Sequence, residues 1–206
     1  MDPLAAEDPL LQALKGRQPE LVIIGGSAGG VNALLHLFPG LPAGYPLPIV
    51  AILHVMAGRP SQLAEVFQQR VALKVREAGD KDELVPGTLY FAPAGYHLLL
   101  EGEGTIALSC DPPLHFARPS IDVAMESAAD AYGPGLVGIL LTGANDDGAA
   151  GMAAIGAAGG LTVVQDPYEA EVEIMPQRAI DKRAPDLVLP LEDIKRLLLM
   201  LEKSDE

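Results

Sequence analysis

The sequence is short of several residue types, and each shortage narrows the range of possible functions. It has one cysteine among 206 residues, so no disulfide can form within the chain and a reducing cytoplasm is the expected compartment. It has no tryptophan, and aromatic residues make up only 4% of it, which disfavours a platform for stacking nucleic-acid bases. Basic residues number 14 against 28 acidic ones, and the net charge of −14 repels polymeric phosphate. We therefore expect no nucleic-acid partner.

Long apolar runs and an export signal are also missing. Apolar stretches such as 136–141 and 197–201 are far shorter than the ~20 residues that a helix needs to cross a bilayer. The N-terminus carries acids and prolines where an export signal needs a basic start and an apolar middle. We expect no membrane insertion and no export. A hydrophobic content of 49% in a chain of this length predicts one domain at 20–203, preceded by a lead-in at 1–19.

The most informative stretch is 21–30, LVIIGGSAGG. Its apolar start predicts a fully buried strand, and its glycines predict a sharp turn into a helix, with Ser27 in the turn. We expect Gly25 and Gly26 to have backbone angles that a side chain would forbid. The stretch matches the G-x-S-x-G pattern of a nucleophile elbow, and catalysis, anion binding and tight packing remain open. The dinucleotide-binding pattern G-x-G-x-x-G is not met, because Ser27 stands where it needs glycine.

Strands and helices alternate along the rest of the chain. Apolar runs at 48–53, 136–141 and 161–165 predict further buried strands separated by helical patterns. Residues 96–100 and 105–109 break the alternation and predict a β-hairpin, which we expect as an antiparallel addition to the sheet. The predicted fold class is α/β: a doubly wound, mainly parallel sheet flanked by helices, with an antiparallel β-hairpin.

Polar residues follow two of these strands. His54 ends the strand at 48–53, at the sheet edge where open α/β folds carry their chemistry, whereas His36, His97 and His115 lie where structural roles are expected. Asp147 follows the strand at 136–141 and precedes a helix.

The position of Asp147 and its neighbour Asp146 fits a helix cap, a metal site or a member of a catalytic triad. Magnesium would need further carboxylates at other strand ends, where Asp80 and Asp166 are only weak candidates. We predict no metal site.

Ser27, His54 and Asp147 should meet at one edge of the sheet, because each follows a buried strand. The chemistry of a hydroxyl nucleophile needs this set: a base must take its proton, and a carboxylate must orient the imidazole. Their order along the chain differs from the Ser, Asp/Glu, His order of α/β-hydrolases, which disfavours that fold.

Several motifs, spread over about residues 20–190, together resemble one family: the CheB-type protein-glutamate methylesterase domain of bacterial chemotaxis. By this resemblance 20–203 is the methylesterase domain, and Ser27, His54 and Asp147 match the family's catalytic serine, histidine and aspartate. The motifs are IGGSAGG (24–30), LHVM (53–56), PGTLYFAPAGYH (86–97), RPSID (118–122), LTGANDDGAAGM (141–152) and MPQRAI (175–180).

The resemblance implies hydrolysis of glutamate γ-methyl esters on the cytoplasmic helices of chemoreceptors, or on a related signalling protein, giving methanol and a carboxylate. The family often also deamidates receptor glutamines. Ser27 would attack the ester carbonyl, His54 would act as base and then acid, and Asp147 would orient His54. No metal or organic cofactor is implied.

This sequence departs from the family at the predicted rim of the site. The family usually has Ser-Thr-Gly-Gly where Ala28 stands, His-Met-Pro where His54-Val55-Met56 stands, and Gly-Met-Gly where Gly143-Ala144-Asn145 stands. Ala28, Met56, Arg118 and Ala144 are the predicted substrate and oxyanion rim. Because Arg118 precedes Pro119, we expect its side chain outside the next helix, in the cleft or in a salt bridge.

Two further expectations concern regulation and alternatives. The ~20 residues before the first strand are too few for the family's receiver domain, so we expect control by a separate regulator or none by phosphorylation in cis. The altered rim leaves open a retargeted or inactive binding module in a signalling complex. The glycine-rich turn alone leaves open a nucleotide-binding domain.

Overall fold

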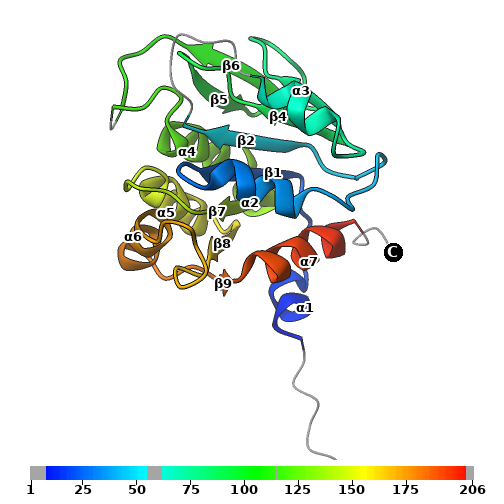
Figure 1. Ribbon diagram of the computed structural model, residues 1–206, viewed down its shortest axis with the longest axis vertical. Helices are drawn as coiled ribbons and strands as arrows, with labels where there is room; N and C mark the ends of the chain where they lie inside the picture. Colours follow the sequence, from blue (N-terminus) through cyan, green and yellow to red (C-terminus); the bar gives the residue numbers. More distant parts are fainter. Residues whose placement is uncertain (1–7, 55–61, 115, 203–206) are drawn as a thin grey trace, which may run out of the picture.

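The computed structural model describes residues 8–54, 62–114 and 116–202, which form a seven-stranded sheet, helices on both its faces, and a separate two-stranded hairpin (Figure 1). In chain order the elements are α1 Pro9–Leu14, β1 Leu21–Gly26, α2 Gly30–Leu37, β2 Ile49–Leu53, α3 Leu63–Gln68, β3 Lys74–Glu77, β4 Thr88–Phe91, β5 His97–Glu101, β6 Thr105–Ser109, α4 Ile121–Tyr132, the 3₁₀ turn η1 Gly133–Gly135, β7 Leu136–Leu140, α5 Ala149–Ala157, β8 Leu161–Gln165, α6 Ile174–Lys182, β9 Leu187–Leu189 and α7 Leu191–Leu201.

The seven-stranded sheet is parallel throughout, with the order β3-β4-β2-β1-β7-β8-β9. Its central strands β1, β2 and β7 are buried along their whole length, which explains why they are continuous apolar runs rather than alternating ones. Strands β2, β3 and β4 form the half of the sheet on one side of β1, with β4 lying between β2 and the edge strand β3, and the chain then returns to β7 on the other side of β1. Such a reversal opens a crevice at the carboxyl ends of the strands, where open α/β sheets bind their ligands.

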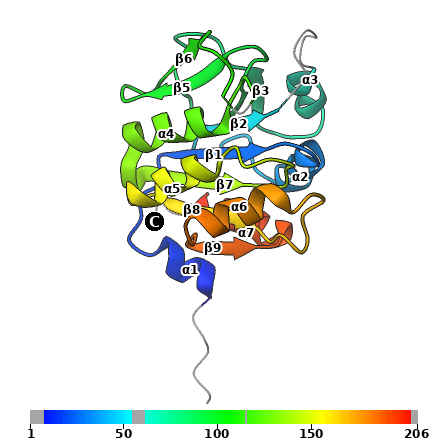
Figure 2. The same cartoon turned by 90° about the vertical axis from the view of Figure 1, so that its left-hand side faces the viewer.

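Helices cover the sheet in two layers, each with its own apolar core (Figures 1 and 2). On one face α2 and α7 pack together with α1 and α3, and buried residues such as Leu34 and Leu197 belong to this core. On the other face α4, α5 and α6 form a row, and Met125 and Met152 belong to the second core. The predicted α/β class, with a parallel sheet flanked by helices, is confirmed.

The hairpin β5–β6 forms as predicted but does not add to the sheet. Strand β4, which precedes it, is already paired with β2 on one side and β3 on the other, so it has no free edge for the hairpin to join. The hairpin instead packs on α4, and its buried Leu98, Leu100 and Ile106 belong to the same core as Met125. The expectation of an antiparallel extension of the sheet was therefore wrong.

The described part of the lead-in is the short helix α1. Asp8 caps it by accepting a hydrogen bond from the Leu10 amide at 3.1 Å, and the Leu10 side chain is buried in the first core. Asp8 also pairs with Arg196 of α7. These contacts attach the segment to the α7 side of the domain (Figure 1). The boundary at residue 19 stays a prediction.

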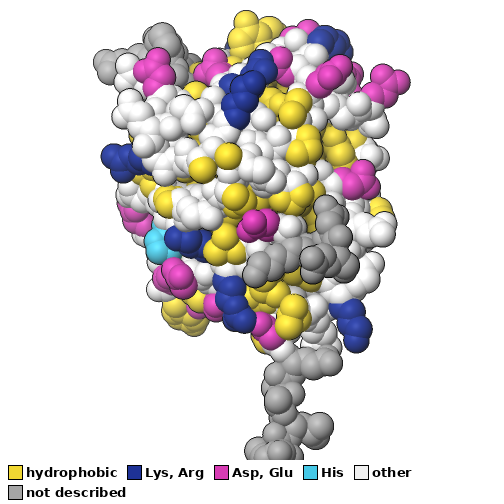
Figure 3. All heavy atoms as spheres, turned by 90° about the vertical axis from the view of Figure 1, so that its right-hand side faces the viewer, with side chains coloured by type: hydrophobic (Ala, Val, Ile, Leu, Met, Phe, Trp, Pro, Cys, Tyr) yellow, Lys and Arg dark blue, Asp and Glu magenta, His cyan; other side chains and the backbone are white. Residues whose placement is uncertain are grey.

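Across the described ranges, no helix combines the length and apolar character needed to cross a bilayer. On the face shown in Figure 3, Lys and Arg side chains lie scattered among acidic and apolar ones rather than in one patch.

Candidate active site

Strand register places Ser27 beside His54. Gly26 of β1 pairs with Leu53 of β2, and the His54 amide donates to the Gly26 carbonyl at 3.4 Å, so the two following side chains start from the same edge. On the other side of β1, the Ser27 amide donates to the Thr142 carbonyl at 3.0 Å, just beyond the end of β7. The carboxyl ends of three adjacent strands therefore hold the candidate nucleophile in place.

The glycines around Ser27 are needed for space more than for unusual backbone angles. A Cβ on Gly25 would lie 2.4 Å from Cγ2 of Ile121, because α4 packs directly on this part of β1. Gly25 and Gly26 do not have positive φ, so the sequence-based expectation for them was wrong; Gly29, at the start of α2, has φ of 80°. Ser27 does not have positive φ either, so this turn is not a strained elbow of the α/β-hydrolase kind.

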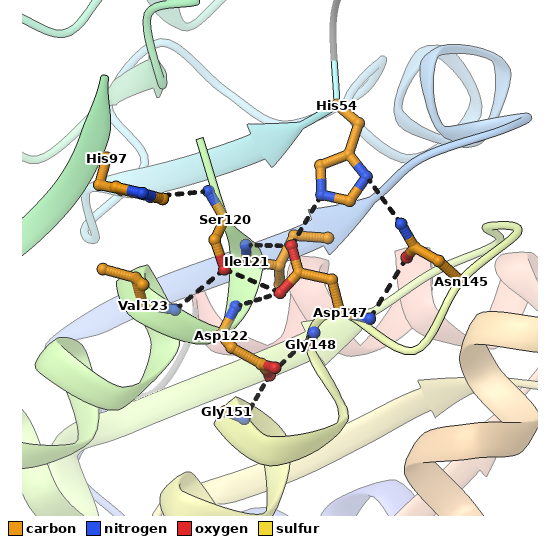
Figure 4. Close-up of polar contacts among 10 residues, drawn as sticks. All are labelled: His54, His97, Ser120, Ile121, Asp122, Val123, Asn145, Asp147, Gly148 and Gly151. Atoms are coloured by element: carbon orange, nitrogen blue, oxygen red, sulfur yellow. Dashed lines mark hydrogen bonds and ion pairs between the residues drawn. The ribbon is translucent and has the colours of Figure 1, made fainter. Parts of the chain in front are cut away.

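His54 and Asp147 form a direct pair, with 2.8 Å between Nε2 and Oδ2 (Figure 4). The His54 side chain is 15% exposed and that of Asp147 is fully buried. Asp147 also accepts three further hydrogen bonds: from the Ser120 hydroxyl at 2.9 Å and from the amides of Ile121 and Asp122, each at 2.8 Å. These last three donors come from the N-terminus of α4, where a carboxylate is also favoured by the helix dipole.

These donors keep Asp147 ionised despite its burial. Burial alone would raise the pKa of the Asp147 carboxyl, but the hydrogen bonds from His54, from the Asp122 and Ile121 amides and from Ser120 outweigh it and hold the pKa below its ordinary value. A permanent negative charge at Oδ2 fixes the proton of neutral His54 on Nε2. Nδ1 is then the nitrogen left to accept a proton.

A second aspartate makes the hydrogen bonding between α4 and α5 reciprocal. Asp122, in the first turn of α4, accepts hydrogen bonds at its Oδ1 from the amides of Gly148 and Gly151, at 2.9 and 2.8 Å. The first amides of α4 thus bind Asp147, which lies just before α5, and the first amides of α5 bind Asp122, which lies in α4 (Figure 4). A helix cap was one of the roles left open for Asp146 and Asp147; the N-cap of α5 is Gly148, which makes no side-chain hydrogen bond to the helix.

Ser120 connects these hydrogen bonds between α4 and α5 to His97. Ser120 is the N-cap of α4, and its hydroxyl accepts a hydrogen bond from the Val123 amide while donating one to Asp147. Its own amide donates to Nδ1 of His97 at 3.2 Å, so Nε2 of His97 carries the proton and donates to the Pro112 carbonyl at 3.1 Å. His97 is buried and structural, as expected. His36 pairs with Glu192 at the surface, and His115 lies outside the described residues.

The four residues predicted to form the substrate and oxyanion rim lie in different surroundings. Ala28 and Ala144 are exposed at this edge, whereas Met56 lies outside the described residues. Arg118 donates from Nη1 to the carbonyls of Cys110 and Asp111, at 2.9 and 3.0 Å. These bonds hold the loop after β6, and the place of Arg118 in the substrate rim stays a prediction.

Two residues at the site were not among the predicted site residues, although Asn145 had been noted as a departure from the family. Thr142 Oγ1 donates to the Ala28 carbonyl at 2.9 Å and accepts from the Val172 amide at 2.8 Å, tying the Ser27 turn to the loop before α6. Asn145 places Nδ2 3.5 Å from Nδ1 of His54. Both lie in the motif that contains Asp147, and their position within a few residues of a candidate triad member was the available signal.

The described residues contain no group of three or more His, Cys, Asp or Glu side chains placed to hold a metal ion. Asp80 and Asp166, the weak magnesium candidates, accept backbone amides from Leu108 and Tyr168. What the edge does assemble is a hydroxyl, an imidazole and an ionised carboxylate, the set required for nucleophilic attack on a carbonyl.

Comparisons with known proteins agree on one family. Residues 22–198 match the family model described as CheB methylesterase. A Leptospira interrogans protein described as a candidate protein-glutamate methylesterase/protein-glutamine glutaminase is 41% identical over 186 residues, covering 90% of this chain and 96% of that protein. The protein-glutamate methylesterase FrzG of Myxococcus xanthus is 38% identical over 87% of this chain, but this chain spans only 54% of its length.

A solved structure extends the agreement to three dimensions. The CheB methylesterase catalytic domain of Thermotoga maritima superposes with a TM-score of 0.85 at 32% identity, covering 89% of this chain and 99% of that domain. Several other relatives are matched over about half their length, as FrzG is, whereas the Leptospira protein is matched almost completely.

Proposed function

Because the chain belongs to the CheB methylesterase family, we propose that it hydrolyses γ-methyl esters of glutamate side chains with Ser27 as nucleophile, His54 as base and Asp147 as the orienting carboxylate. The observation that carries the proposal is the 2.8 Å pair between His54 and a fully buried, ionised Asp147, beside the strand end that presents Ser27. A carboxylate held this firmly can orient the imidazole and stabilise its protonated form.

The reaction has two steps. Nδ1 of His54 takes the proton of Ser27 Oγ as the oxygen attacks the ester carbonyl carbon, and the same proton then goes to the methoxy oxygen as the C–O bond breaks and methanol leaves. Water repeats the sequence on the acyl-serine and releases the glutamate carboxylate. Within the described part of the chain Ser27 Oγ has no hydrogen-bond partner, and such contacts often tighten only when substrate binds.

The developing oxyanion has a donor available at the start of α2. The Ser27 amide is already bound to Thr142, but the Ala28 amide donates to no group within the described residues. Together with the positive end of the α2 dipole, the Ala28 amide supports an oxyanion site next to Ser27. The family usually has threonine at position 28, so this site would rest on the backbone rather than on a side-chain hydroxyl.

The substrate follows from the family. We propose methylated cytoplasmic helices of chemoreceptors, or of a related signalling protein, as substrates, with deamidation of receptor glutamines as a second reaction. The Leptospira relative's description combines the two activities, whereas FrzG carries only the first in its name. The same reasoning favours a cytoplasmic enzyme.

Methanol release from a methylated receptor cytoplasmic fragment tests the proposal. Wild-type protein should release methanol, and Ser27→Ala should release none above background. Ser127→Ala, which removes a hydroxyl that serves the packing of β5 on α4, is the matched control and should keep most of the activity. Equal release by wild type and Ser27→Ala would overturn the proposal. Binding of the fragment without any turnover would support the alternative, an inactive binding module with an altered rim.

A further inference from the structure

Asn145 presents a hydrogen-bond donor to the nitrogen that moves the proton. It lies in the loop between β7 and α5, half-buried, and its Oδ1 accepts from the Asp147 amide at 3.3 Å. This bond fixes the amide orientation, so the NH₂ end faces His54, with 3.5 Å between Nδ2 and Nδ1 (Figure 4). Because Asp147 occupies Nε2, Nδ1 is the atom that hands the proton to the leaving group.

The donor next to Nδ1 has different consequences for the two reactions. A methoxy oxygen has two lone pairs, so it can take the proton from Nδ1 and still accept a hydrogen bond from Nδ2. The nitrogen of a carboxamide adduct has one lone pair, which the proton consumes, and its own N–H groups then point at another donor. A buried pair of donors that face each other without an acceptor is unfavourable.

We propose that Asn145 is a specificity-determining residue that favours the methyl ester over the carboxamide as the substrate of this site. The inference rests on the proposed function and deepens it. In the ester reaction the C–O bond breaks, the His54 proton and a hydrogen bond from Asn145 both go to oxygen, and methanol leaves. In the amide reaction the C–N bond breaks, the proton goes to nitrogen, and ammonia leaves without help from Asn145.

The family usually has glycine where Asn145 stands, so the chain offers a natural comparison. Asn145→Gly removes the donor, and Asn145→Asp keeps the shape while replacing the NH₂ group with an acceptor. Asp146→Asn, exposed on the same loop, is the control for changes in the loop itself. Esters react faster than amides without any enzyme, so the informative quantity is the change in the ratio of the two kcat/KM values.

Two forms of one receptor cytoplasmic fragment serve as substrates, one with a glutamate methyl ester and one with glutamine at the same position. Methanol and ammonia release give kcat/KM for each. We expect Asn145→Gly to lower the ester-to-amide ratio about tenfold, mostly through the ester reaction, since one hydrogen bond is lost there. Asn145→Asp should lower the ratio further, and Asp146→Asn should leave it unchanged.

The outcomes separate the two levels of the proposal. A ratio that stays the same in Asn145→Gly, with methanol still released by the wild type, would overturn the role of Asn145 and leave the esterase intact. Absence of both methanol and ammonia release by the wild type would overturn both. An equal loss of both reactions in Asn145→Gly would show that Asn145 only supports the loop, and would also overturn the specificity role.

Discussion

The two aspartates at the α4–α5 contact have nearly the same surroundings and opposite behaviour. Asp147 and Asp122 are both buried. Asp147, which precedes α5, accepts hydrogen bonds from two amides at the start of α4, and Asp122, which lies in α4, accepts hydrogen bonds from two amides at the start of α5. For Asp147, the added bonds from His54 and Ser120 outweigh burial and lower the pKa. For Asp122, burial is the largest effect, and together with repulsion from Asp147 and Glu126 it raises the pKa despite the two amides.

The arrangement of donors on the oxygens explains what each aspartate can tolerate. Both amides bound by Asp122 go to one oxygen, Oδ1. The four donors to Asp147 are divided between its two oxygens, with Ser120 and the Asp122 amide on Oδ1 and His54 and the Ile121 amide on Oδ2. An asparagine can therefore replace Asp122 and keep both bonds, whereas at position 147 its NH₂ group must face two donors.

The largest difference is expected in the rate. Asp147→Asn removes the charge that fixes the His54 tautomer, so kcat/KM for methanol release should fall about 10⁴-fold, as the loss of the orienting carboxylate does in a serine protease triad. Asp122→Asn should stay within about tenfold of wild type. Similar losses of kcat/KM in the two variants would mean that the hydrogen bonds between α4 and α5, rather than the pair of His54 and Asp147, determine the activity.

The next difference is in stability. Asp147→Asn should lower the free energy of unfolding by about 3 kcal/mol, because two buried donors lose their acceptor at roughly 1–3 kcal/mol each. Asp122→Asn should change it by less than about 1 kcal/mol, while Asp122→Ala, which strands both glycine amides, should cost about 2–3 kcal/mol. Urea unfolding measures all three. A larger loss in Asp122→Asn than in Asp147→Asn would contradict the assignment of the oxygens.

A smaller effect on activity and stability is expected at Ser120, which both caps α4 and donates a hydrogen bond to Asp147. Ser120→Ala removes the cap of α4 and one donor to Asp147, so it should cost about 1 kcal/mol in stability. Its kcat should fall by about tenfold or less, since three donors to Asp147 remain. Ser120→Thr keeps the hydroxyl and should recover most of both losses; failure of threonine to restore either quantity would indicate that the side chain acts through packing.

The two aspartates should change the pH dependence of stability in opposite directions. The lowered pKa of Asp147 means that its contribution to stability is present above the unfolded-state pKa of about 3.9 and is lost as pH falls through its folded-state pKa. The raised pKa of Asp122 means that its contribution is present at low pH and is lost as pH rises through its folded-state pKa.

Urea midpoints between pH 3 and 7 test this difference. Relative to wild type, Asp122→Asn should gain stability as pH rises, because it removes a charge that folding disfavours. Asp147→Asn should lose stability over the same interval. A shift of the same sign in both variants would contradict the opposite pKa directions.

The sequence was sufficient to predict those parts of the structure that depend on local residue patterns and on the alternation of strands and helices. Ser27, His54 and Asp147 each follow a buried strand, and parallel strands bring such residues to one edge, which is where the fold places them. The assignment of these residues to catalysis stays a prediction that the variants above address.

What could not be predicted depends on packing between elements far apart in the chain. Asp122 binds amides of α5 and Asp147 binds amides of α4, which requires the two helices to lie side by side, so the local sequence of either helix does not reveal these bonds. Gly25 is needed because Ile121, about a hundred residues later, lies against it. The separate hairpin follows from β4 having both its edges already paired.

Covalent labelling of the serine tests the central claim most directly. A fluorophosphonate reacts with a hydroxyl only when a base has activated it, and intact-mass and peptide analysis can locate and time the modification. We predict labelling of wild type at Ser27, labelling of Asp122→Asn at a similar rate, and labelling of Asp147→Asn slower by at least a hundredfold, roughly. No labelling of wild type at Ser27, or equal rates in the two aspartate variants, would contradict the account.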